Sequence, residues 1–277
     1  MFRSSRPRTL CDYPFEYHQL MPKAKSTTSS PPTGLFAIIS DIHANIDALE
    51  AVFADIDQQG IKEILCLGDI VGYGAAPAEC LWLVRKRCKA TVIGNHDAYT
   101  LVDLNDYKLE KRVGDGIRHA QKALTTEERK WLRSLPLNLE VGSMTIVHAT
   151  LHHPDSFEYL RGWDDFLMHF EKQRTPVSFF GHTHRPEVAL LRGDLDLGFG
   201  IPGEGEILLD RARACAINVG SVGQPRDGSR RATYGIYDPK EHSFTLRRVD
   251  YDIERAAQRI LDAGLPEENA ARLFKGE

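Results

Sequence analysis

Short apolar runs rich in β-branched or aromatic residues recur along the chain, and polar residues follow each of them directly. The runs lie at Ala37 to Ser40, Ile64 to Leu67, Thr91 to Ile93, Thr145 to Val147 and Val177 to Phe180. Continuous apolar stretches of this length are typical of strands that are buried on both faces. The pattern therefore predicts five buried strands.

Between these strands, apolar residues recur at helical spacing. In the first such segment they are Ile46, Leu49, Val52, Phe53 and Ile56. Helices are expected over residues 45–59, 77–87, 112–124 and 127–135. Gly60 would end the first helix, Pro77 suits the first turn of the second, and Thr126 would cap the last. The alternation of strands and helices predicts parallel βαβ units.

Further along the chain the pattern changes to strands with few helices. The expected strands span residues 188–191, 206–209, 214–219, 233–237 and 243–249. The last two resemble a hairpin, because the connection between them has turn residues at Asp238 to His242. Together the two halves predict an α/β fold of two mixed β-sheets packed face to face and flanked by helices, which is an αββα sandwich.

Composition and charge fit one domain over residues 34–277. The 277 residues are 42% hydrophobic and 27% charged, which is enough for a substantial core. A net charge of -4 and a pI near 6.3 provide no broad basic surface, so specific nucleic-acid binding is not predicted. The five cysteines are scattered and include no C-x-x-C, which argues against disulfides or a thiolate metal site and favours a cytoplasmic protein. No feature predicts an oligomeric state.

The first 33 residues are polar and basic and end in the linker-like stretch Ser26 to Pro32. We expect residues 1–33 to form a flexible leader, and Met21 is an alternative start. The leader lacks the apolar core of a secretory signal. No stretch of the sequence is apolar enough to span a bilayer, so no membrane association is predicted.

Polar clusters follow the five predicted strands. They are Asp41-Ile42-His43, Gly68-Asp69, Gly94-Asn95-His96-Asp97, His148 and Gly181-His182-Thr183-His184. Loops that leave the carboxyl ends of parallel strands converge at one edge of a sheet, where ligands bind. Alone, Asp41 or Asp69 is better explained as a helix cap. The ordered set instead predicts nitrogen and oxygen ligands for two divalent ions that share one carboxylate.

In this order the clusters resemble the D-x-H, G-D, G-N-H-D, H and G-H-x-H series of the calcineurin-like metallophosphoesterases. The resemblance extends from about Leu35 to the C-terminus and implies that superfamily's αββα fold. It implies one ion held by Asp41, His43 and His184, a second held by Asn95, His148 and His182, and Asp69 as the bridge. Mn²⁺ is the first expectation for both ions, and Fe²⁺, Zn²⁺ and Ni²⁺ are alternatives.

The resemblance also implies a mechanism, in-line attack on phosphorus by a metal-bridging hydroxide. His96 then remains free for catalysis, either to stabilise developing charge or to protonate the leaving oxygen. Its neighbour Asp97 has two interpretations, orienting His96 or capping a short helix that starts at Ala98. Other histidines, such as His119, are better explained as packed or solvated side chains.

The loop after the second predicted strand indicates which branch of the superfamily the chain resembles. Phosphoprotein phosphatases of this fold carry an Asp-Arg pair where this chain has Gly72 and Tyr73. A Ser/Thr protein phosphatase is therefore not expected. The loop Gly68 to Gly74, the Gly181 to Pro186 stretch and the Asn218 to Gly228 stretch instead resemble the small prokaryotic phosphodiesterases of the superfamily.

Three further residues are candidates for substrate binding. Arg185 follows the histidine pair directly, Arg226 lies in a glycine-containing loop, and Asn218 precedes that loop. Surface exposure of the arginines and turn capping by Asn218 are the alternatives. The predicted function is that of a phosphodiesterase. Its predicted partner is a small phosphoester substrate, and nucleotides are one such class. Phosphomonoester hydrolysis and a non-catalytic metal-binding scaffold or regulator on the same fold are the alternatives.

Overall fold

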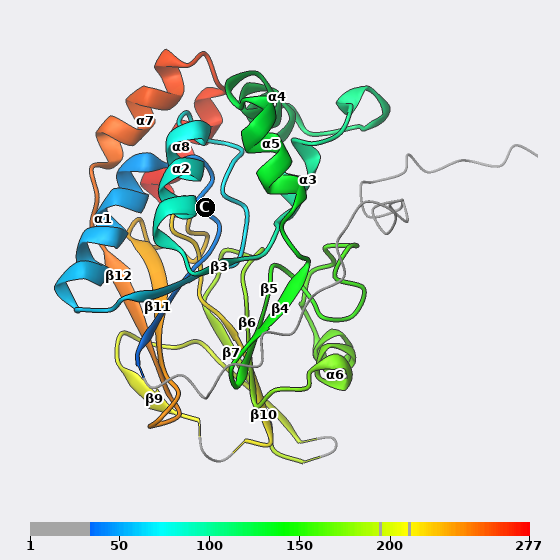
Figure 1. Ribbon diagram of the computed structural model, residues 1–277. Helices are drawn as coiled ribbons and strands as arrows, with labels where there is room; N and C mark the ends of the chain where they lie inside the picture. Colours follow the sequence, from blue (N-terminus) through cyan, green and yellow to red (C-terminus); the bar gives the residue numbers. More distant parts are fainter. Residues whose placement is uncertain (1–33, 194–195, 210–211) are drawn as a thin grey trace, which may run out of the picture.

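A computed structural model of the chain describes residues 34–193, 196–209 and 212–277. Two six-stranded sheets pack against each other, and helices cover their outer faces (Figure 1). The predicted α/β class and the sandwich of two mixed sheets are confirmed. The expected leader, residues 1–33, lies outside the described residues.

The first sheet has the strand order β3-β2-β1-β11-β12-β9. Its strands are β1 (Phe36–Ile39), β2 (Glu63–Cys66), β3 (Ala90–Thr91), β9 (Glu206–Leu208), β11 (Ala232–Asp238) and β12 (Ser243–Val249). The first three are parallel and are connected by α1 (Ile46–Gln58) and α2 (Pro77–Arg87), as predicted. The β11–β12 hairpin is also confirmed. Strand β3 is shorter than expected and ends at Thr91.

The second sheet has the strand order β4-β5-β6-β10-β7-β8. Its strands are β4 (Asn138–Val141), β5 (Met144–Val147), β6 (Val177–Phe180), β7 (Glu187–Leu191), β8 (Leu197–Gly200) and β10 (Ala214–Asn218). Strands β5, β6 and β10 run parallel, and the other pairs are antiparallel. The outer strands β4 and β8 were not predicted.

Side-chain alternation along the central strands builds the layers. In β1, Phe36 and Ile38 point into the core between the two sheets, whereas Ala37 and Ile39 point toward the helices on the outer face. This two-residue period is the geometry of an extended strand. In β6, Phe180 faces away from the other sheet and packs with aromatic residues of α6 (Trp163–Lys172).

The remaining helices lie at the carboxyl ends of the parallel strands and at the C-terminus of the chain. They are α3 (Asn95–Tyr99), α4 (Lys111–Ala123), α5 (Thr126–Arg133), α7 (Ile253–Asp262) and α8 (Glu267–Lys275), together with a 3₁₀ turn at Leu104–Asp106. The cap of α5 is Thr125 rather than the predicted Thr126, because the Thr125 hydroxyl accepts from the Glu128 amide at 3.3 Å. Helices α6, α7 and α8 were not among the helices predicted from the sequence.

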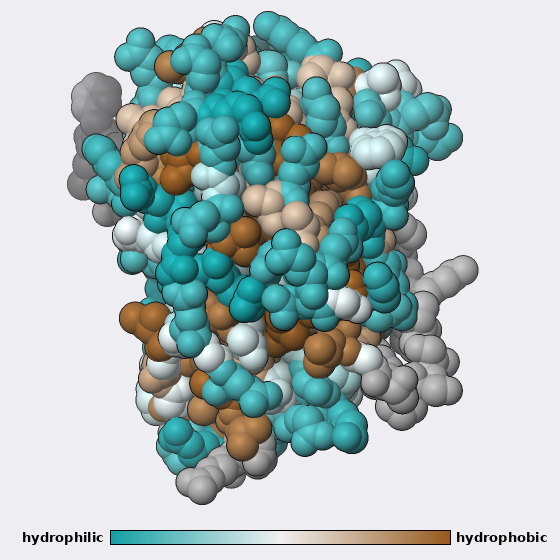
Figure 2. All heavy atoms as spheres, turned by 90° about the vertical axis from the view of Figure 1, so that its left-hand side faces the viewer, coloured by the Kyte–Doolittle hydropathy of each residue, from teal (hydrophilic) through white to brown (hydrophobic). Residues whose placement is uncertain are grey.

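Helix α7 packs against α1. Helices α7 and α8 pack against each other and form a hairpin on one side of the molecule (Figure 1). Figure 2 views the side that carries α1, α7 and β12 and shows hydrophilic side chains over most of the helical half. This agrees with the amphipathic pattern of α7, whose Ala256, Ala257 and Ile260 are buried. In the described part of the chain, every helix is too short or too polar to cross a membrane.

Candidate metal centre

Five of the predicted ligands lie on loops with left-handed backbone geometry. Positive φ angles of 50–66° occur at Asp41, His43, Asp69, His182 and His184. Such angles are uncommon for residues other than glycine, and each costs on the order of 1 kcal/mol or more. Strained positions of this kind concentrate at functional sites. The strain here falls at the carboxyl ends of β1, β2 and β6, where ligand binding was expected.

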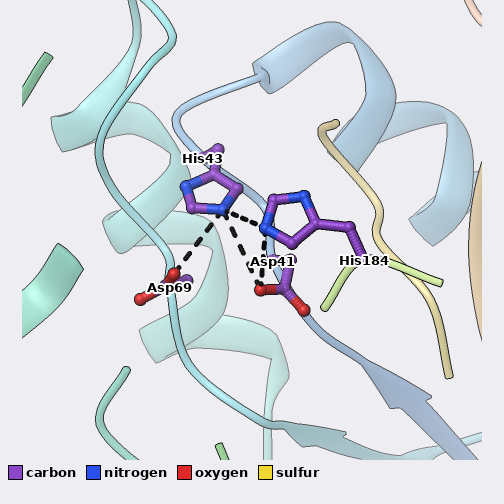
Figure 3. Close-up of side chains that lie close together, drawn as sticks. All are labelled: Asp41, His43, Asp69 and His184. Carbon is purple, nitrogen blue, oxygen red and sulfur yellow. Dashed lines mark hydrogen bonds and ion pairs between the residues drawn. The ribbon is translucent and has the colours of Figure 1, made fainter. Parts of the chain in front are cut away.

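Two groups of buried side chains share Asp69. In the first, single ligand atoms of Asp41, His43, Asp69 and His184 all lie within 4.8 Å of one another. Figure 3 shows the rings of His43 and His184 directed toward the carboxylates of Asp41 and Asp69. Ligand atoms of Asp69, His148 and His182 satisfy the same limit and form the second group.

Hydrogen bonds fix the tautomers of the two histidines in the first group. The Nδ1 atom of His43 lies 3.1 Å from the Val71 carbonyl, and that of His184 lies 2.6 Å from the Gln224 carbonyl. Because a carbonyl can only accept, each Nδ1 carries the proton and each Nε2 presents a lone pair. The two Nε2 atoms lie 3.0 Å apart. A cation bound by both would remove the repulsion between the lone pairs, so this group fits a metal ion.

The second group has the same design. His148 donates from Nδ1 to the Leu67 carbonyl at 2.8 Å, and its Nε2 lies 3.1 Å from Asn95 Oδ1. The Nε2 atom of His182 is buried without a hydrogen-bond partner, which is costly for a polar atom unless a ligand satisfies it. Thus the structure brings all seven predicted ligand positions together in two adjacent groups.

Asp69 lies between the two groups. Its Oδ1 accepts the backbone amide of His96 at 2.8 Å, which fixes the carboxylate. Its Oδ2 lies 3.6 Å from His43 Nε2 and 3.4 Å from His148 Nε2. One oxygen therefore faces both groups, as a bridging ligand would.

Burial and charge set the protonation of the ligands. Burial lowers the pKa of His43, His182 and His184 well below the usual range, so these rings are neutral, as metal ligation requires. Burial acts to raise the pKa of Asp69, but the charges of His148 and His96 outweigh it and hold this pKa below its usual range. Against the effect of its own burial, Asp69 raises the pKa of His148 to about 9. A metal ion would displace that proton.

His96 lies beside the two groups. Its ring packs against Tyr73 and His43 at centroid distances of 4.6 and 4.7 Å, and burial lowers its pKa to about 4. Its Nδ1 is buried without a partner. A Cβ atom at Gly72, where φ is +90°, would lie 2.2 Å from that Nδ1. Only glycine therefore fits at position 72. Burial keeps the His96 ring neutral, and no carboxylate among the described residues bonds to its Nδ1.

The carboxylate of Asp97 accepts hydrogen bonds from the backbone of two loops. It accepts from the amides of Ile70 at 2.9 Å, Val71 at 3.2 Å and Gly94 at 3.1 Å. Of its two predicted roles, these contacts support capping, although the helix that it caps begins at Asn95 rather than Ala98. Asp97 thereby fixes the loop of Asp69 to the start of α3.

The candidates for substrate binding differ in position. The half-buried Arg226 donates to Gln224 Oε1 at 2.8 Å, and its Nε is buried without a partner. Burial lowers the pKa of His184, and the Arg226 charge lowers it further. Arg185 is exposed and donates from Nε to the Arg226 carbonyl at 2.8 Å. Asn218 is fully buried and donates to the Gly181 carbonyl at 2.7 Å, a contact that agrees with the alternative of holding a turn.

Sequence reasoning missed Tyr159. Its ring stacks on His182 with centroids 4.1 Å apart and an interplanar angle of 25°. Tyr159 belongs to a long connection between β5 and α6 that carries no motif and no periodic pattern, so only the folded chain reveals the contact.

An α/β sandwich with two metal-capable groups at the ends of parallel strands is the arrangement expected of a metallophosphoesterase. The calcineurin-like phosphoesterase superfamily domain matches residues 35–242, and the chain belongs to this family. Helices α7 and α8 follow the matched residues.

The chain is 41% identical over 246 residues to an uncharacterized protein of Methanocaldococcus jannaschii, covering 87% of this chain and 98% of that protein. Among solved structures, a metallophosphoesterase from Sphaerobacter thermophilus has a TM-score of 0.79 and 36% identity, with 89% of this chain and 100% of that chain covered. The symmetrical bis(5'-nucleosyl)-tetraphosphatase of Actinobacillus pleuropneumoniae is 31% identical over 109 residues, which cover 37% of this chain and 39% of that protein.

Proposed function

We propose that this chain is a two-metal phosphodiesterase that hydrolyses a small phosphodiester or nucleotide. The observation that carries the proposal is the position of Asp69 Oδ2, which faces the Nε2 atoms of His43 and His148 from between the two groups. A single bridging carboxylate is the arrangement that holds two ions close enough to act on one phosphate.

In this proposal Asp41, His43 and His184 hold one ion, and Asn95, His148 and His182 hold the other. Mn²⁺ suits these nitrogen and oxygen ligands, as do Fe²⁺, Zn²⁺ and Ni²⁺. When bound, such ions lower the pKa of water to about 7 and polarise phosphoryl oxygens. The residues around them must then bind the ester, orient it and stabilise the charge that develops.

His96 and Arg226 are suited to those tasks. A pKa of about 4 leaves His96 neutral at pH 7. In this proposal it therefore acts as a hydrogen-bond donor to the oxygen on which charge develops and not as a protonated general acid. The Arg226 guanidinium approaches the same site, and its unpartnered Nε can donate to a phosphoryl oxygen. The match to the bis(5'-nucleosyl)-tetraphosphatases supports nucleotides as the substrates to test first.

The test is hydrolysis by protein stripped of metal and then reloaded with Mn²⁺, Zn²⁺, Ni²⁺ or Mg²⁺ singly. Bis(p-nitrophenyl) phosphate and p-nitrophenyl phosphate provide the matched diester and monoester. We expect diester cleavage that requires metal and falls by about 10² or more in Asp69→Asn. The control is Asp103→Asn, an exposed aspartate that caps the 3₁₀ turn through the Asn105 amide.

Two outcomes would overturn the proposal. Faster cleavage of the monoester would make the protein a phosphomonoesterase. No turnover of either ester, with metal shown to be bound, would leave a metal-binding scaffold or regulator.

A further inference from the structure

A cavity of about 520 Å³ opens beside the candidate metal centre. Its polar lining comes from Tyr159, Arg161, Thr183, Arg185, Glu187 and Arg226. Thr183 lies between the metal-group residues His182 and His184, and Arg226 faces the same histidines. The cavity therefore lies next to the place where the reacting phosphate would bind.

Aromatic and guanidinium groups build one wall outward from His182. The Tyr159 ring stacks on His182 at 4.1 Å, and the Arg161 guanidinium lies 4.4 Å from the centroid of the Tyr159 ring. Tyr159 thus contacts both His182 and Arg161, and its ring holds the Arg161 guanidinium beside the cavity.

The cavity carries an excess of positive charge. Among the described residues that line it, three are arginines and one, Glu187, is acidic. Within the described chain, neither Arg161, Arg185 nor Arg226 has an ion-pair partner, whereas other arginines, such as Arg247 with Asp55, do. Three guanidinium groups without carboxylate partners around one cavity favour an anionic ligand.

The positions of the three arginines indicate that they contact different parts of the ligand. The backbone amide of Arg226 donates to the His184 carbonyl at 3.1 Å, and its guanidinium lies 3.4 Å from the hydroxyl of Tyr73, whose ring packs against His43 and His96. Arg226 is therefore placed to meet the reacting phosphate. Arg185 is attached to the Arg226 backbone by its Nε, and Arg161 lies beyond Tyr159, so both are set farther out along the cavity. A neutral leaving group would not require these two.

We propose that this cavity binds a second phosphate of the substrate, so that the protein selects organic phosphoesters with at least two phosphate groups. Arg161 and Arg185 bind the second phosphate through paired N–H donors. This inference rests on the proposed phosphoesterase function, because it takes the reacting phosphate to lie at the metal groups. The second phosphate could be linked by an anhydride or could stand elsewhere on the same molecule.

The test is equilibrium binding to the Mn²⁺-loaded protein by calorimetry, which needs no turnover. The probes are adenosine monophosphate, α,β-methylene adenosine diphosphate and adenosine 3',5'-bisphosphate. We expect one of the two-phosphate probes to bind about 10-fold or more tightly than the monophosphate, since charge-assisted hydrogen bonds are the strong ones. The two-phosphate probe with the higher affinity identifies how the second phosphate is linked.

Arg161→Gln should reduce that affinity ratio by about 10-fold, and Arg161→Lys should restore part of it because the charge returns without the planar fork. Arg133→Gln, at an exposed arginine of α5, should leave the ratio unchanged. Equal affinities of all three probes in the wild type would overturn the inference. So would an equal loss for every probe in Arg161→Gln, because Arg161 would then only support Tyr159. Failure of the proposed function would instead appear as absent ester hydrolysis, whatever the affinities.

Discussion

At the scale of single residues, the hydrogen bonds behind the metal groups are as informative as the ligands themselves. Backbone carbonyls of Val71, Gln224 and Leu67 each accept from the Nδ1 atom of a site histidine. Each carbonyl fixes a ring orientation and leaves Nε2 available as a ligand. The sequence could place these histidines after strands, but it could not show which nitrogen faces inward, because the accepting carbonyls come from distant loops.

Replacing His96 tests its proposed role. We expect His96→Ala to retain bound metal, because His96 belongs to neither metal group, and to lose about 10²-fold in kcat, because a donor to the developing charge is removed. Steady-state kinetics on the activated diester and metal analysis would check this. His153→Asn, at an exposed histidine, is the control. Unchanged kcat in His96→Ala would remove His96 from the mechanism.

At the scale of elements, the C-terminal hairpin reaches the site from beyond the residues that match the family. Asn269 of α8 is fully buried, and its amide donates to the Tyr73 carbonyl at 3.2 Å and to the Arg112 carbonyl at 3.2 Å. Tyr73 in turn packs against His43 and His96. The hairpin therefore helps to position the loop that confines His96, and Asn269 is a positioning residue.

We expect Asn269→Ala to lower the free energy of unfolding by about 1–3 kcal/mol, because the buried Tyr73 carbonyl and the part-buried Arg112 carbonyl lose a donor. We also expect kcat to fall while metal binding persists, because Tyr73 would no longer be held against His96. Chemical denaturation and steady-state kinetics are the measurements. Gln258→Ala on the exposed face of α7, where the side chain contacts Asp262, is the matched control. Loss of stability with full activity would limit Asn269 to a structural role.

The elements that could be predicted from the sequence are those with dense apolar patterns. Strands β1, β2, β5 and β6 are buried on both faces, so their composition alone identifies them. Strand β8 was missed because it contains two glycines and is half exposed, so only its pairing with β7 makes it a strand. Helices α7 and α8 were not predicted, although the buried residues of α7, Ala256, Ala257 and Ile260, recur at helical spacing.

At the scale of the whole molecule, the candidate metal centre joins the two sheets. Asp41 and Asp69 follow strands of the first sheet, and His148, His182 and His184 follow strands of the second. Ions bound between them would therefore connect the two halves of the sandwich. A ligand at 100 times its Kd adds about 2.7 kcal/mol to the free energy of unfolding, so removal of the metals should lower Tm by several degrees.

The pH dependence of the metal-free protein should identify the proton that metal displaces. The pKa of His148 in the fold is about 9, against 6.5 for an ordinary histidine, so this group contributes stability that is present below pH 6.5 and lost as pH rises through 9. Between pH 7 and 9 we expect the free energy of unfolding of the metal-free protein to fall by on the order of 2 kcal/mol. The loss should be absent in His148→Gln, which cannot titrate. It should also be absent in the Mn²⁺-loaded wild type, because the proton is then already displaced. Denaturant titrations of the three samples at both pH values would measure it. The same decrease in wild type and His148→Gln would show that the proton lies elsewhere, and that His148 is neutral before metal binds.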